Sequence, residues 1–79
     1  MENLTYLVVE KDTENNLIEK NFDTSKEDAL TYFKSRCDIL AKELNGWKME
    51  PGINSCIWSK DDRYKLIYVQ INGIENLEF

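Results

Sequence analysis

The chain contains no histidine, one proline, three glycines and two cysteines among its 79 residues. Histidine is the most frequent general acid or base and the commonest metal ligand, so its absence removes the usual basis for catalysis and metal binding. Cys37 and Cys56 form no CxxC motif and are expected to be small buried residues. The glycines are isolated, which excludes a glycine-rich phosphate-binding loop. We therefore expect that the protein is not an enzyme and that it has no catalytic residue, no bound metal and no cofactor.

Long apolar runs are also missing. No stretch approaches the roughly 20 residues that a membrane-spanning helix needs. The opening residues MENLTYLVVEK have no basic region before their apolar stretch and no small-residue cleavage site, which is unlike a secretory signal peptide. The sequence thus predicts a cytoplasmic protein with reduced thiols and no membrane partner.

Positive charge is scarce. Lys and Arg total 10 against 15 Asp and Glu, so the net charge is −5 and the isoelectric point is about 4.6. Direct binding of nucleic acid needs a basic surface that displaces counterions, so nucleic acid is not an expected partner. An acidic chain fits the basic surface of another protein, such as a nucleic-acid-binding channel. The same charge also keeps a small protein soluble without any partner.

Hydrophobic residues make up 42% and aromatic residues 11% of the chain, which is enough for a packed core. Its length indicates one small domain over residues 1–79. Such a domain buries only about 60–65% of its unfolded surface. Since neither a disulfide nor a metal is expected, self-association or a partner is the expected source of further stability.

The strongest local signal is an amphipathic helix over residues 25–45. Thr24 with Glu27, or Ser25 with Asp28, has capping-box spacing at its start. Gly46 is a stop signal at its end. Apolar residues recur between them at the helical period. The predicted core stripe contains Leu30, Phe33, Cys37, Leu40, Ala41 and Leu44.

Segments rich in β-forming residues flank this helix on both sides. The predicted strands are residues 4–10, 17–22, 47–50, 53–60 and 64–72. Polar residues 12–16 and 60–63 are expected to form turns, and Pro51 and Gly52 fit the centre of a type II turn. The order ββαβββ predicts an α+β fold, with a single helix packed on a mostly antiparallel sheet.

The strands carry more apolar side chains than one helix can cover. Alternation puts Tyr64, Leu66 and Tyr68 on one side of the last strand. In the first strand, it puts Tyr6 on the same side as the other even-numbered residues. We interpret Tyr6, Tyr64, Leu66 and Tyr68 as a second sheet face that binds a partner. Alternatively, Ile74, Leu77 and Phe79 fold back over it, or these residues are ordinary exposed strand residues.

The helix carries a second candidate surface. On a helical wheel, Tyr32 and Ile39 fall away from the core stripe and share a flank with Arg36 and Glu43. Aromatic residues and Arg are enriched at protein interfaces. Tyr32, Arg36, Ile39 and Glu43 are therefore a candidate partner-binding strip.

These features favour a non-enzymatic protein-binding module. In size and charge alone, the chain is similar to small acidic inhibitors and adaptors that act stoichiometrically, including phage-encoded ones that block host defence nucleases. The resemblance implies a regulator of another protein, and Asp61 and Asp62 are candidate contacts to a basic partner. Two alternatives stay open. One is a self-assembling homodimer, and the other is a small-ligand pocket lined by Trp47, Trp58 and Phe33.

Overall fold

The computed structural model describes residues 4–73. Strands and helix follow one another in the predicted order ββαβββ. The elements are β1 (Leu4–Asp12), β2 (Leu17–Asn21), α1 (Lys26–Glu43), β3 (Lys48–Pro51), β4 (Ser55–Lys60) and β5 (Arg63–Gly73). Each predicted element exists, and the bounds differ from the predicted ones by only a few residues.

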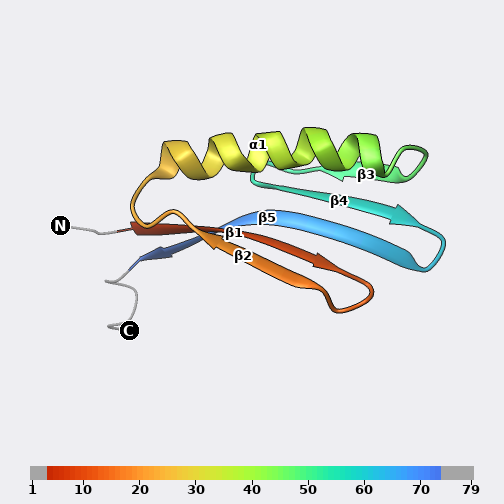
Figure 1. Ribbon diagram of the computed structural model, residues 1–79, viewed down its shortest axis with the longest axis horizontal. Coiled ribbons are helices and arrows are strands. Elements are labelled where there is room, and N and C mark those ends of the chain that lie inside the picture. The colour runs from red at the N-terminus through yellow and green to blue at the C-terminus, as the bar shows by residue number, and fades with distance from the viewer. Residues whose placement is uncertain (1–3, 74–79) are drawn as a thin grey trace.

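The five strands form one antiparallel sheet in the order β2-β1-β5-β4-β3. α1 lies along one face of this sheet (Figure 1). The chain passes from β2 at one edge, through α1, to β3 at the other edge, and then returns to the centre with β5. The predicted α+β fold, one helix on an antiparallel sheet, is confirmed.

Local signals account for the bounds of α1. Ser25 is the N-cap, and its hydroxyl accepts a hydrogen bond from the backbone N–H of Asp28, so the second of the two predicted capping pairs is used. Lys42 in the last turn suits the negative end of the helix dipole. Gly46 follows with a φ of +91°, a conformation that glycine adopts without strain.

The core lies between α1 and the sheet. Its largest member is Trp58, which is 1% exposed. The other buried core residues are Tyr6, Val8, Ala29, Phe33, Leu40, Cys56, Ile67 and Val69. Ala41 was predicted in the helical stripe but is exposed, whereas Ala29 is fully buried. The buried stripe therefore begins one residue earlier than predicted and passes beside Ala41 rather than through it.

The turn between β3 and β4 lies later than predicted. Pro51 is the last residue of β3 and lies opposite Cys56, rather than at the centre of a turn. The backbone N–H of Gly52 donates to the carbonyl of Ser55 at 2.7 Å and closes the connection. A proline is tolerated there because β3 is an edge strand, where one N–H is not needed for the ladder.

Candidate interaction surface

No described element covers the face of the sheet turned away from α1, which we call the helix-free face (Figure 1). Side chains directly opposite each other in antiparallel strands project to the same face. Val9 lies opposite Tyr68, and Leu66 lies opposite both Lys11 and Ile57. The centre of the helix-free face is thus apolar and spans β1, β5 and β4. It consists of Leu7, Val9, Ile57, Leu66 and Tyr68.

This apolar centre remains partly accessible. Val9 is 1% exposed, but the other four members are only half-buried. Leu17 on β2 and Tyr64 on β5 extend the centre, with 56% and 40% of their surface exposed. A sheet face in contact with water normally carries mostly polar side chains, so this apolar composition is unusual for a face that no described element covers.

Charged residues at the two sides of the helix-free face balance one another. Lys11 and Glu19 lie toward the β2 edge, and Lys48 and Glu50 lie on β3. The Nζ atom of Lys48 lies 3.3 Å from Oε2 of Glu50, while Nζ of Lys11 lies 5.6 Å from the ring centroid of Tyr68. Uncharged polar residues complete the rim: Thr5, Asn21, Ser55, Ser59, Gln70 and Asn72. An apolar centre within a polar, charge-balanced rim has the anatomy of a protein interface.

Tyr6 does not belong to this surface, which corrects the predicted grouping. It lies opposite Ile71, is 7% exposed and packs in the core beneath α1. Tyr64, Leu66 and Tyr68 do share the helix-free face, and β1 contributes Leu7 and Val9 to it instead of Tyr6. Alternation within each strand was predicted, but the register that matches one strand's face to the next strand's face was not.

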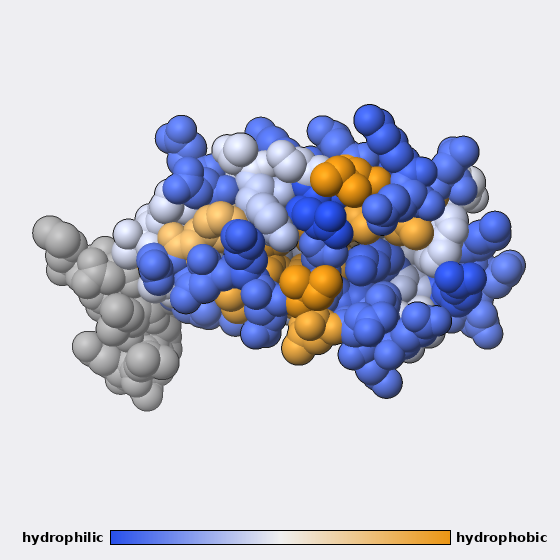
Figure 2. All heavy atoms as spheres, in the orientation of Figure 1, coloured by the Kyte–Doolittle hydropathy of each residue, from blue (hydrophilic) through white to orange (hydrophobic). Residues whose placement is uncertain are grey.

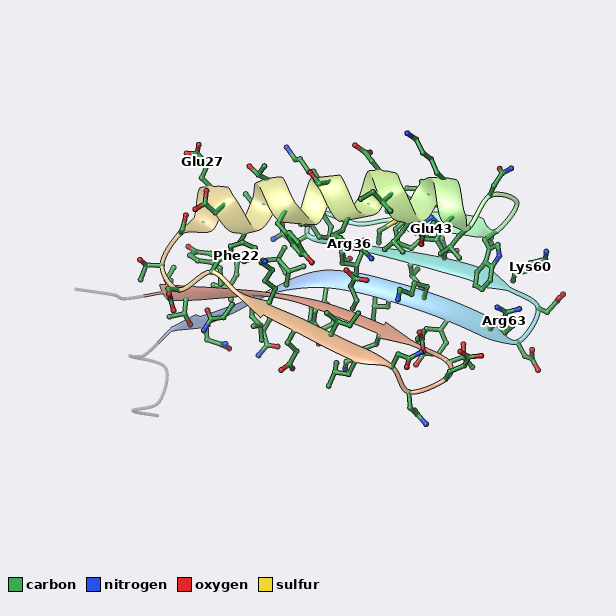
Figure 3. All side chains as sticks on the ribbon, in the orientation of Figure 1. Phe22, Glu27, Arg36, Glu43, Lys60 and Arg63 are labelled. Carbon is green, nitrogen blue, oxygen red and sulfur yellow. The ribbon has the colours of Figure 1, made fainter. Side chains whose placement is uncertain are left out.

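The predicted helix strip is also corrected, because only part of it faces outward. Tyr32 packs against the core, with its ring centroid 5.3 Å from that of Phe22. Arg36 points from α1 toward the sheet (Figure 3). Ile39 is 44% exposed and Glu43 is also exposed. The four residues therefore do not form one outward contact surface.

The reason for the direction of Arg36 is a buried carboxylate. Glu10 on β1 is 2% exposed and accepts hydrogen bonds from Nε of Arg36 at 2.7 Å and from Nη2 at 3.0 Å. Nζ of Lys65 lies 3.6 Å from the same carboxylate. The hydrogen bonds from Arg36 hold the pKa of Glu10 below its usual value, although burial alone would raise it. The pair joins α1 to β1.

Sequence reasoning did not identify Glu10 as part of this contact. The available signal was an acid at the core-facing position that follows Tyr6 and Val8 in an otherwise apolar alternation. A buried carboxylate needs a partner cation. Arg36 is the helix cation that supplies it.

The acidic turn has the predicted location. Asp61 and Asp62 connect β4 to β5 and are exposed, and Asp61 has a φ of +57°. A positive φ in a two-residue hairpin loop matches the twist of the flanking strands, which accounts for this turn structurally.

Several hollows lie at different places on the described part of the molecule, and none is the predicted pocket. One of about 180 Å³ is lined in part by Trp47, Arg63 and Glu43, near the end of α1 (Figure 3). Another of about 310 Å³ lies between α1 and β3 and includes Phe33. Trp58 is in the core and lines neither. Phe33 and Trp58 lie in the core and Trp47 packs against it, so the three predicted residues pack in or against the core and do not line one pocket.

Both cysteines are free, and both thiols are protonated at neutral pH. Burial raises the pKa of Cys37 to about 11 and also raises the pKa of Cys56. A thiol needs to lose its proton to act as a nucleophile or a metal ligand, so these side chains are poorly suited to either role. Within residues 4–73 no group of three or more His, Cys, Asp or Glu side chains could hold a metal ion.

No helix in the described part of the chain is long and apolar enough to cross a membrane. The tail residues Ile74, Leu77 and Phe79, predicted as an alternative cover for the second sheet face, lie outside the described residues. No protein-family model, curated protein or solved structure matches this chain.

Proposed function

We propose that this chain is a non-enzymatic protein-binding module that inhibits or regulates another protein, and that it docks through the helix-free face. The observation that supports the proposal is the half-buried apolar centre on β1, β4 and β5, surrounded by a rim in which two cations balance two anions. Interfaces combine an apolar centre that excludes water with a polar rim that sets orientation.

The helix-free face has a suitable size. Five strands spaced about 4.8 Å apart give a width of about 24 Å. The nine residues of β1 span about 27 Å at roughly 3.4 Å per residue. The resulting area of about 650 Å² approaches the ~800 Å² per partner of a standard protein interface. One flat protein surface is enough to cover it.

The charge balance of this face defines the chemistry of its partner. The net charge of the chain is −5, but the described charges on the helix-free face sum to zero. The matching surface on the partner is accordingly apolar at its centre and close to neutral. Binding is then expected to change little between low salt and 1 M salt, where the screening length is about 3 Å.

A partner with a basic surface would behave differently. It would contact exposed acids such as Asp61 and Asp62, and its affinity would fall steeply as salt rises. Salt dependence thus separates docking on the helix-free face from electrostatic capture by the acidic turn.

The experiment compares two matched substitutions of an aliphatic residue by an acid. Leu66→Asp places a carboxylate in the centre of the helix-free face, and Ile39→Asp places one on the exposed side of α1. The partner is first identified with a photo-crosslinking amino acid in place of Tyr64. The binding of each variant to that partner is then measured by calorimetry. Leu66→Asp is expected to weaken binding by about a hundredfold, as for a central interface residue, whereas Ile39→Asp leaves it unchanged.

Folding of each variant is checked by circular dichroism. If Leu66→Asp does not fold, Tyr64→Asp tests the same face at a more exposed position. Full binding by the face variants, together with lost binding by Ile39→Asp, would place the interface on α1 and refute the proposal.

A further inference from the structure

The two edges of the sheet differ in how well they are protected against strand pairing. β2 forms one edge and β3 forms the other (Figure 1). An edge strand exposes backbone N–H and C=O groups that can pair with another chain, and proteins usually block them with proline, charge or short strands. The hydrogen bonds of neighbouring strands show which residues of β2 and β3 point these groups outward.

The β3 edge is blocked by a proline. The N–H of Val69 donates to the carbonyl of Asn54 at 2.9 Å, so even-numbered positions of β4 pair with β5 and odd-numbered ones pair with β3. Ser59 and Ile57 lie opposite Lys48 and Glu50. Met49 and Pro51 consequently direct their backbone to the free side, where Pro51 has no N–H to donate.

The β2 edge is short and carries Glu19 and Lys20, but it lacks the proline that blocks the β3 edge. The N–H of Phe22 donates to the carbonyl of Tyr6 at 2.8 Å, so even-numbered residues of this segment face β1. The N–H and C=O groups of Leu17, Glu19 and Asn21 therefore point away from the sheet. β2 contains no proline, and all five of its residues are exposed.

Two apolar side chains accompany these free backbone groups. Leu17 is 56% exposed and Ile18 is 50% exposed, and they project to opposite faces of the sheet. Figure 2 shows an apolar patch over β2 among mostly hydrophilic residues. An open edge flanked by exposed aliphatic residues is the kind of edge that pairs with another strand.

We infer that β2 pairs antiparallel with β2 of a second copy of this chain, so that two five-stranded sheets join edge to edge. Such a dimer is isologous, because the same strand supplies both sides of a two-fold contact. The contact uses the backbone edge of β2 rather than the centre of the helix-free face, although Leu17 and Glu19 border both, and the inference does not depend on the proposed function.

The sequence of β2 selects one register for this pairing. Residues opposite each other in the two copies must project to the same face. The register can therefore change only in shifts that keep odd-numbered residues opposite odd-numbered ones. Placing Glu19 opposite its own copy would set two carboxylates side by side, and placing Lys20 opposite its own copy would do the same with two ammonium groups. Both arrangements are unfavourable.

The register centred on Ile18 avoids both clashes of like charge. It sets Ile18 against Ile18 of the second copy and Leu17 against Glu19, while Lys20 meets the uncharged Asn16. Ile18 then occupies a non-hydrogen-bonded pair, where side chains approach most closely. A further shift would centre the contact on Leu17 and leave only residues 16–18 paired, because the φ of +66° at Asn15 ends the extended segment.

This complementarity argues for a second copy rather than an unrelated strand. In this register one short strand supplies an apolar central pair and no like-charge pair when it meets itself. The contact area is small, so a weak dimer is expected, with a dissociation constant between about 10 μM and about 1 mM.

The test uses matched proline substitutions on the two edges. Glu19→Pro removes an outward N–H from β2, and Met49→Pro removes an outward N–H from β3, without taking a donor from the ladder inside the sheet. Sedimentation equilibrium is run on each full-length protein from about 10 μM to about 1 mM. For the parent chain and Met49→Pro the average mass is expected to rise clearly above 9.3 kDa as concentration increases, whereas Glu19→Pro weakens dimerisation at least about tenfold.

A mass that stays at 9.3 kDa for the parent chain over this range would overturn the inference. So would equal dimerisation of Glu19→Pro and Met49→Pro. If Glu19→Pro does not fold, Ile18→Lys sets two ammonium groups against each other and is expected to weaken the dimer about tenfold as well. Leu66→Asp should leave this dimer intact, so failure here is distinguishable from failure of the proposed function.

Discussion

Substitution of Arg36 by methionine tests whether the contact with Glu10 stabilises the packing of α1 on the sheet. Methionine keeps an unbranched apolar stem, so the main change is loss of the guanidinium. The Glu10 carboxylate, 2% exposed, would lose hydrogen bonds of 2.7 and 3.0 Å and keep only Lys65 at 3.6 Å. An unpaired buried charge is strongly unfavourable.

Removing one partner of a fully buried ion pair costs roughly 3–5 kcal/mol. The side chain of Arg36 is 26% exposed, and Lys65 still contacts the carboxylate, so the lower end of this range applies. We expect Arg36→Met to lower the free energy of unfolding by about 3 kcal/mol at pH 7. A chain of 79 residues has roughly 4–12 kcal/mol in total, so the loss is large but measurable.

The pH dependence gives the sharper result. In the parent chain the pKa of Glu10 is lowered, so its contribution to stability is present above the ordinary carboxyl pKa and is lost as pH falls through the lowered value. Without Arg36, burial is left as the largest influence and raises the pKa. The variant should then gain stability relative to the parent as pH falls from 7 toward 4, because protonation removes the buried charge.

Urea titrations monitored by tryptophan fluorescence measure both effects, since Trp58 is in the core. Lys34→Met is the matched control, because Lys34 is an exposed cation on the same helix. A loss below about 1 kcal/mol for Arg36→Met at pH 7, typical of an exposed ion pair, would refute the reasoning. A loss that is constant between pH 7 and pH 4 would refute the assignment to Glu10.

Two further predictions follow from backbone geometry and from thiol burial. Gly46→Ala should lower the free energy of unfolding by about 1 kcal/mol and the melting temperature by roughly 4–8 °C. The added Cβ meets nothing within 4 Å, so only the φ of +91° opposes it, and an unchanged melting temperature in a thermal scan would contradict this account. Cys37, with its pKa raised to about 11, should react with iodoacetamide at pH 8 about a hundredfold more slowly than a free cysteine. Mass spectrometry measures the rate, and alkylation as fast as that of the free amino acid would show that the thiol is not shielded.

Much of the fold could be predicted because its signals are local. The cap at Ser25, the stop at Gly46 and the helical period between them place α1 within two residues of its observed bounds. Alternation and turn residues place the strands. Pro51 was assigned to a turn because proline favours turns, whereas its position at a free edge depends on strand order, which no local pattern encodes.

The candidate surfaces were harder to predict because they depend on pairing between distant strands. Tyr6 was grouped with Tyr68, but their strands are paired so that Val9 lies opposite Tyr68. Arg36 was placed on an outer flank because a helical wheel contains no information about a carboxylate on β1. Both corrections arise from contacts between residues more than twenty positions apart, which periodicity within one segment cannot reveal.

The central position of β5 has a consequence for how this molecule forms. β5 alone connects β1 and β2 on one side with β4 and β3 on the other. Until residues 63–73 leave the ribosome, the earlier segments are two separate hairpins and a helix with no shared sheet. β5 follows the other described strands in the chain and joins them, so the sheet is completed only after β5 has emerged and depends on contacts between distant parts of the chain.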